Sequence, residues 1–240
     1  MGCWQMTETR DSTPMSEQPA LTIPAGTRFG YREGPLWHRR QRCLVETPQD
    51  VVTGPGLHLL VAPNGSGKTT LLRTLAGLLP ALSGSVNAGG HVYYFSDELR
   101  ADSELKPRTL FRSLLKNGAL AMAEELAETL RLDLNRPIGQ LSRGNRQKVL
   151  LILAEVKVAH ENAGVLLMDE PLTGLDAETR AQMTALWSSA QTKAVRLVIL
   201  HELESVRHAD SLLSIHGGRL AHAREKSGAT WLDTYHSLQS

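Results

Sequence analysis

The chain has 240 residues, of which 41% are hydrophobic and 21% are charged, enough for one α/β domain with a sizeable core or one domain with a small subdomain. Lysine and arginine total 26 against 25 acidic residues, and the net charge of +1 argues against a general nucleic-acid binder. No apolar run approaches the roughly 18 residues of a membrane-spanning helix, and the first residues show no signal-peptide pattern. The two cysteines, Cys3 and Cys43, match no metal spacing and predict a reducing compartment.

The first half of the chain begins with a polar segment and continues with strand signals. Residues 1–20 are rich in Thr, Ser, Glu and Pro, which predicts a disordered lead. Residues 21–56 contain short apolar runs broken by Gly and Pro, as short strands do. The basic run at 38–42 is expected to face water rather than lipid headgroups. The run at 57–61 predicts a strand, and the run at 71–76 predicts a helix.

The segment 62–70 lies between that strand and that helix and is rich in Gly. A strand, a Gly-rich turn and a helix form a phosphate cradle, because backbone N–H groups and the positive end of the helix dipole face the anion. In the pattern G-x-x-x-x-G-K-[ST], Lys68 reaches the terminal phosphates and Thr69 ligates Mg²⁺. Ala62 replaces the first Gly, which costs about 1–2 kcal/mol if its backbone must be left-handed. The residues expected to bind the nucleotide here are Asn64, Gly65, Ser66, Gly67, Lys68, Thr69 and Thr70.

Strand and helix signals alternate through the second half of the chain. This alternation implies a parallel sheet with helices on its faces. The predicted strands are 85–87, 91–95, 165–168 and 195–200, the predicted helical segments are 107–134, 142–160 and 177–190, and a hairpin is expected at 215–220.

Two further motifs can carry phosphate chemistry. Asp169 and Glu170 close the apolar run at 165–168; a carboxylate there can hold Mg²⁺ through water, and its neighbour can polarise an attacking water. Ser142 is a plausible helix N-cap, and Gly144 leaves the backbone open to a phosphate. Taken alone, Ser142 and Gly144 predict only a capped helix.

In combination, these motifs resemble the nucleotide-binding subunit of an ATP-binding cassette (ABC) transporter over about residues 21–220. The resemblance rests on the P-loop, Leu-Ser-x-Gly at 141–144, Met-Asp-Glu-Pro at 168–171, a D-loop-like Leu-Thr-Gly-Leu-Asp at 172–176 and His201 after an apolar strand.

The resemblance implies a P-loop NTPase (RecA-like) α/β parallel-sheet core with a small antiparallel β portion and an inserted helical subdomain at about 100–160. The domain would span 21–225, followed by a tail helix at 226–240. It further implies that two subunits, as a homodimer, close head to tail around two ATP molecules. Hydrolysis would energise transport by a separate integral membrane permease, which places the chain on the cytoplasmic face of the membrane.

The resemblance also assigns roles within one subunit. Glu170 would be the catalytic base, and His201 would contact the γ-phosphate and help to align water and base. Mg²⁺ would be supported by Thr69 and Asp169.

Other assigned residues act across the dimer or on the base of the nucleotide. Ser142 and Gly144 would cap the γ-phosphate bound by the other subunit, and Asp176 would act across the interface. Tyr31 is the expected adenine-stacking aromatic residue, with Trp37 as its rival.

The chain departs from the family pattern in places. The usual Gln after the strand near residue 95 is missing, and Asp97 is the nearest candidate Mg²⁺ ligand. The signature has Arg143 and Asn145 where Gly and Gln are usual. Two alternatives therefore stay open, a soluble ABC-type ATPase outside transport and a degenerate ATP-binding module that hydrolyses little.

Overall fold

The computed structural model describes residues 20–34, 40–96, 101–160, 164–188, 193–200, 203, 206 and 208–239. The predicted disordered lead lies almost wholly outside these residues, and so do Trp37, Asp97 and His201.

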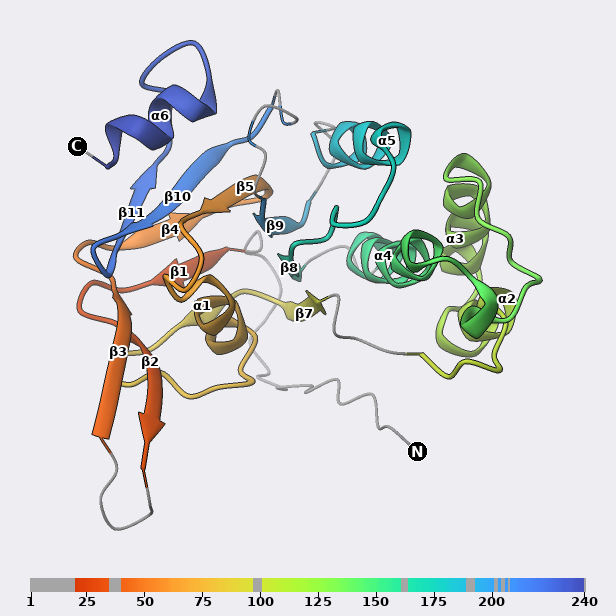
Figure 1. Cartoon of the computed structure of the whole chain (residues 1–240), viewed down its shortest axis with the longest axis horizontal. Coiled ribbons are helices and arrows are strands. Elements are labelled where there is room, and N and C mark those ends of the chain that lie inside the picture. Colours follow the sequence, from red (N-terminus) through yellow and green to blue (C-terminus); the bar gives the residue numbers. More distant parts are fainter. Residues whose placement is uncertain are drawn as a thin grey trace.

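An eight-stranded sheet forms the centre of the molecule (Figure 1). Its strand order is β2-β3-β11-β10-β5-β9-β8-β7. The stretch from β10 to β7 is parallel, and the antiparallel hairpins β2–β3 and β10–β11 extend one side. The strands are β2 (Arg28–Glu33), β3 (Arg40–Glu46), β5 (Gly56–Val61), β7 (His91–Ser96), β8 (Gly164–Asp169), β9 (Val195–Ile199), β10 (Ser211–His216) and β11 (Arg219–Ala223).

A second, antiparallel sheet has three short strands, in the order β4-β1-β6. These are β4 (Val51–Thr53), β1 (Leu21–Ile23) and β6 (Asn87–Ala88). The small sheet and helix α1 (Lys68–Leu75) share one hydrophobic core with one face of the large sheet. The predicted P-loop NTPase core with a small antiparallel β portion is therefore confirmed.

The remaining helices share the core on the other face of the large sheet. Figure 1 shows α2 and α3 at the end of the molecule away from the β2–β3 hairpin, with α4 and α5 between them and the sheet, and α6 over β10 and β11. The helices are α2 (Pro107–Leu114), α3 (Gly118–Thr129), α4 (Arg143–His160), α5 (Ala177–Trp187) and α6 (Trp231–Ser237), with a 3₁₀ turn at Ile138–Gln140.

The boundaries of several predicted elements differ from the structure. The segment 107–134 is two helices, because Leu115 is extended and Asn117 has a φ of 48°, and a right-handed helix continues through neither conformation. The strand expected at 85–87 begins only at Asn87. The expected tail helix is confined to Trp231–Ser237.

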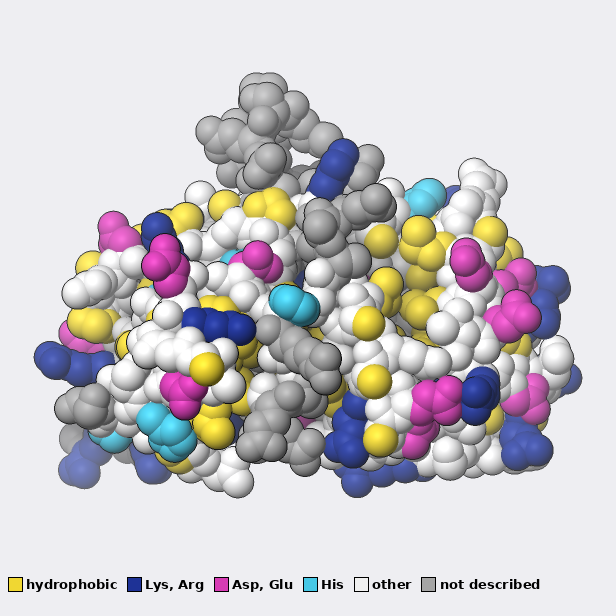
Figure 2. Space-filling model, turned by 90° about the horizontal axis from the view of Figure 1, so that it is seen from above, with side chains coloured by type: hydrophobic (Ala, Val, Ile, Leu, Met, Phe, Trp, Pro, Cys, Tyr) yellow, Lys and Arg dark blue, Asp and Glu magenta, His cyan; other side chains and the backbone are white. Residues whose placement is uncertain are grey.

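Figure 2 shows how charge is distributed on one face of the protein. Basic and acidic side chains are mixed over the helix-rich end of that face. Two of the ion pairs at this end are Arg108 with Glu124 at 2.9 Å and Arg131 with Glu178 at 2.8 Å. Exposed pairs of this kind are worth about 0–1 kcal/mol each, so packing rather than charge holds the helices.

A buried polar cluster fastens α4 and α5 to β9. Arg196 Nη2 lies 2.8 Å from Glu155 Oε2, and Trp187 Nε1 donates to Glu155 Oε1 at 2.7 Å. All three side chains are almost fully buried, so removing one partner would leave an uncompensated group, at a cost of about 3–5 kcal/mol for a buried ion pair. The cluster fixes the helix that begins at the Leu-Ser-x-Gly motif against the centre of the sheet.

A second buried network joins β5, β10 and β11 through two histidines and a serine. Because the Gly54 carbonyl can only accept, His58 Nε2 donates to it at 2.8 Å, and His58 Nδ1 accepts from the Ser211 hydroxyl at 2.7 Å. Ser211 in turn accepts from His222 Nε2 at 2.9 Å. Burial lowers the pKa of His58, and burial followed by the charges of His58 and Arg224 lowers the pKa of His222 to about 4.

We therefore expect the stability of the protein to fall as the pH drops below the ordinary histidine pKa of 6.5, because the unfolded chain binds protons that the native His58 and His222 reject. Urea unfolding between about pH 7.5 and pH 5 measures this slope. His222→Leu should reduce the slope, since one of the two groups is gone. His208→Gln, at an exposed histidine, is the control, and an unchanged slope in His222→Leu would contradict the assignment.

Candidate functional site

The Gly-rich loop at 62–67 joins the end of β5 to the start of α1, as predicted. Gly65 and Gly67 have φ values of 77° and 99°, which L side chains rarely adopt. A Cβ on Gly67 would lie 3.0 Å from side-chain atoms of Leu44 and Val45 on β3. The loop therefore turns in a narrow space, and its two glycines allow the backbone to curl over the first turn of α1.

Ala62 shows no left-handed backbone. The non-glycine residues with positive φ in the described part of the chain are Asn117, Arg131 and Glu170. The backbone strain that would accompany a left-handed Ala62 is therefore absent. Ala in place of the usual first Gly adds no conformational strain to the loop.

Lys68 folds back over the loop. Its ammonium donates to the carbonyl oxygens of Ala62 at 2.7 Å and Pro63 at 3.1 Å, and the residue is only 7% exposed. Burial lowers the pKa of Lys68, and the charges of Glu170 and Asp169 oppose that shift. A buried cation held at the mouth of the loop is suited to an anionic ligand.

Ser66 supplies a second observation for a ligand at the loop. Its hydroxyl oxygen is buried and has no hydrogen-bond partner among the described residues. A buried hydroxyl without a partner costs about 1–3 kcal/mol. A turn of the side chain toward phosphate oxygens in the loop would relieve that cost, so this residue fits the predicted polyphosphate.

Asp169 ends β8 and lies beside Thr69 at the start of α1. Burial raises the pKa of Asp169, and a hydrogen bond with the Thr69 side chain opposes the shift. The Tyr94 hydroxyl donates to Asp169 Oδ2 at 3.4 Å. The Thr69 hydroxyl and the Asp169 carboxylate are adjacent hard oxygen donors, and this donor set fits Mg²⁺ completed by phosphate oxygens and water.

Glu170 stands in a strained conformation directly after this strand. Its φ of 50° is left-handed, which costs a non-glycine residue about 1–2 kcal/mol. Thr173 closes the turn by donating its backbone N–H to the Glu170 carbonyl at 3.2 Å and its hydroxyl to Glu170 Oε2 at 3.4 Å. Strain of this kind is kept where a side chain must be aimed.

The strain predicts a stability difference between two substitutions that both remove the carboxylate. Glu170→Gly should be more stable than Glu170→Ala by about 1 kcal/mol, because Gly adopts a positive φ freely. The same pair at the exposed helical Glu125 is the control and should show the opposite order, Ala above Gly by about 1 kcal/mol. Urea unfolding measures both pairs, and a Glu170→Ala protein as stable as Glu170→Gly would contradict the strained turn.

A cavity of about 470 Å³ adjoins the loop. It is lined by residues 42–44 of β3, 63–66 of the loop and 215–218 at the β10–β11 turn. None of the described residues that line it is acidic, and Arg42 carries a positive charge. Its size and its charge suit an anionic small ligand.

Tyr31 contacts Arg42, which lines this cavity. The two residues are opposite each other in the β2–β3 ladder, and the Arg42 guanidinium carbon lies 5.7 Å from the Tyr31 ring centroid. Arg42 lines the cavity, whereas Tyr31 is not among the described lining residues. Arg42 is more than half exposed, as expected for a basic run that faces water, and it also lines the cavity. The run offered no cue to the cavity, because three segments distant in sequence form it.

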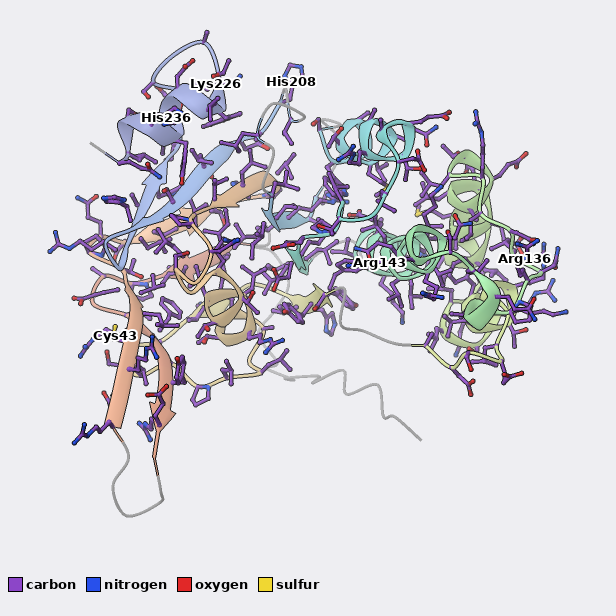
Figure 3. The ribbon with its side chains drawn as sticks, viewed as in Figure 1. Cys43, Arg136, Arg143, His208, Lys226 and His236 are labelled. Carbon is purple, nitrogen blue, oxygen red and sulfur yellow. The ribbon has the colours of Figure 1, made fainter. Side chains whose placement is uncertain are left out.

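Ser142 and Gly144 lie at the start of α4. The Ser142 hydroxyl accepts from the Asn145 N–H at 3.2 Å, which makes it the predicted helix cap. A Cβ on Gly144 would lie 2.7 Å from the Gly174 carbonyl oxygen, so Gly is required by a close backbone approach. In Figure 3 Arg143 lies far across the molecule from Cys43, which lines the cavity. In one copy of the chain, Ser142 and Gly144 therefore lie away from the side of the cavity that Cys43 lines.

Asp176 is the N-cap of α5. Its carboxylate accepts from the backbone N–H and the hydroxyl of Thr179 at 2.8 and 2.9 Å, and these bonds, the first most strongly, lower its pKa to about 2. Lys148 Nζ lies 3.5 Å from Asp176 Oδ2 and donates to the Leu130 carbonyl at 2.9 Å. Lys148, which sequence patterns did not single out, thus joins α3, α4 and the start of α5.

Comparison with known proteins decides the family. The family model described as ABC transporter matches residues 55–173. The zinc import ATP-binding protein ZnuC of Cereibacter sphaeroides is 35% identical over 197 residues, covering 79% of this chain and 76% of ZnuC. The chain belongs to the ABC transporter family. It is an ATP-binding subunit of that family, an ATPase that energises transport.

Two further comparisons concern a longer relative and a solved structure. The mycobactin import ATP-binding/permease protein IrtB of Mycolicibacterium thermoresistibile is 30% identical over 190 residues, and the match covers 67% of this ABC subunit and 31% of IrtB. The solved structure of an ATP-binding subunit of an ABC transporter superposes with a TM-score of 0.69 over 91% of this chain and 98% of that one, at 21% identity. The latter supports the fold. Among the described helices, none combines the length and apolarity needed to cross a lipid bilayer.

Proposed function

We propose that two copies of this chain close head to tail around two ATP molecules with Mg²⁺, and that hydrolysis drives a separate membrane permease. The observation that carries the proposal is the division of the site within one copy. The P-loop, Asp169 and Glu170 converge, whereas the Leu-Ser-x-Gly motif at the start of α4 lies across the molecule (Figure 3). A second copy facing the first would supply the missing half.

The half supplied by the P-loop would hold the phosphates and the metal. Asn64 to Thr70 would surround the phosphates with backbone N–H groups, and Lys68 would exchange its loop carbonyls for phosphate oxygens. Thr69 and Asp169 would hold Mg²⁺, which neutralises phosphate charge when bound.

Glu170 would act as the base. Its carboxylate takes a proton from the attacking water as the water oxygen bonds to the γ-phosphorus and the bond to the ADP oxygen breaks. The left-handed backbone of Glu170 and its contact with Thr173 aim the carboxylate. His201, which lies outside the described residues, keeps its proposed contact with the γ-phosphate on the basis of sequence alone.

The other half would come from the second copy. Ser142 and Gly144 at the start of α4 would present helix N–H groups to the γ-phosphate. Asp176, fixed as the N-cap of α5 and ion-paired with Lys148, would lie at the interface. The backbone of Gly144 lies close to the Gly174 carbonyl, so the two segments are neighbours in one copy.

The proposal also includes a membrane permease and a location in the cell. Family membership, and the name of IrtB, which joins ATP-binding and permease functions, support a membrane partner. We place the chain on the cytoplasmic face of the membrane, bound through that permease.

The first test is ATP turnover by Glu170→Gln. The variant should bind ATP with Mg²⁺ as tightly as the wild type but lose about 10²–10⁴-fold in turnover, since only proton transfer is removed. Steady-state phosphate release and nucleotide binding measure the two effects. Unchanged turnover would contradict the assignment of Glu170 as the base.

Mixing two inactive variants tests the shared site. Lys68→Ala removes the phosphate-binding side chain, and Ser142→Arg blocks the opposing surface, so each variant alone should be nearly inactive. A mixture forms dimers with one intact site and should regain roughly a quarter of wild-type turnover, if subunits mix freely. Thermal unfolding of each variant checks that both are folded, and a mixture as inactive as its components would contradict a head-to-tail homodimer.

A further inference from the structure

We propose that Arg42, rather than Tyr31, is the residue that contacts the nucleoside end of ATP and sets preference for it, with Tyr31 positioning Arg42. This inference rests on the proposed ATP site and adds a residue to it. Arg42 lines the cavity beside the P-loop, and Tyr31 does not.

The strand register fixes the relation of the two side chains. Directly opposed residues of an antiparallel pair project to the same face, and Tyr31 is paired with Arg42. The guanidinium lies over the Tyr31 ring at 5.7 Å. The planar group at the cavity is therefore the guanidinium, and the phenol ring supports it from β2.

Arg42 is also held from a second direction. Its Nη1 lies 3.6 Å from Glu33 Oε1, and both side chains are more than half exposed, so this pair is weak. The ring contact and the weak ion pair limit the positions of the guanidinium. Its charge and its plane stay available for stacking on a base. A planar, delocalised cation stacks on purine bases and is weakly hydrated, which makes it a suitable platform for a base.

The cavity gives the ligand a direction. Its lining includes both residues 63–66 of the P-loop and Arg42 of β3. A nucleotide with phosphates in the loop would extend its nucleoside toward Arg42. Inorganic tripolyphosphate fills the loop alone, so ATP and tripolyphosphate separate contacts to the nucleoside from contacts to the phosphates.

The test compares the binding of ATP and of tripolyphosphate, each with Mg²⁺, to the full chain. Arg42→Ala should weaken ATP by about 5- to 20-fold and leave tripolyphosphate unchanged. Arg42→Lys keeps the positive charge but lacks the planar guanidinium, so it should restore little of the lost ATP affinity. Arg32→Ala, an exposed arginine on β2 outside the cavity, is the matched control for charge and should bind both ligands as the wild type does.

A double-mutant cycle tests the supporting role of Tyr31. Tyr31→Leu should weaken ATP in the wild-type background but add nothing to Arg42→Ala, because Tyr31 acts through Arg42. An equal loss from Tyr31→Leu in both backgrounds would show that the ring itself binds the base and would overturn the inference.

ATP binding that Arg42→Ala leaves unchanged would overturn the inference, as would an equal weakening of ATP and tripolyphosphate. A wild-type protein that binds no ATP would contradict the proposed function itself. The outcomes that overturn the role of Arg42 leave the proposed function standing.

Discussion

The site depends on the register of three parallel strands. Leu60 of β5 and Asp169 of β8 are both paired with Ile199 of β9, so the two strands end at the same level on either side of it. With about 4.8 Å between neighbouring strands, the P-loop and the acidic strand end lie roughly 10 Å apart. The charges of Glu170 and Asp169 act on Lys68 across that gap. A slip of one residue in either pairing would turn Asp169 to the other face.

The local motifs of the sequence predicted most of this arrangement, because each is short and chemically restrictive. The strand, loop and helix around Lys68, the buried strand before Asp169 and the cap at Ser142 all form where they were expected. Features that depend on distant segments were not predictable. The contact of Arg42 with Tyr31 needs the β2–β3 register, and the backbone of Ala62 needs the loop around it.

Strain and close contact distinguish the two halves of the proposed site. In the half built on the P-loop, Glu170 has a left-handed backbone, and the buried Ser66 hydroxyl has no partner among the described residues. In the half at α4, Gly144 lies close to the Gly174 carbonyl and Lys148 pairs with Asp176, which ties the signature to the start of α5. A second copy would bring these two halves together when ATP binds.

The mass of the Glu170→Gln protein in solution tests the central claim, that one copy holds only half of each site. This variant should trap bound ATP, because it keeps the binding groups and loses the base. We predict that light scattering after gel filtration shows a monomer without nucleotide and a dimer with ATP and Mg²⁺, and that Ser142→Arg added to this variant abolishes the dimer. A protein that is saturated with ATP and still monomeric would contradict the account.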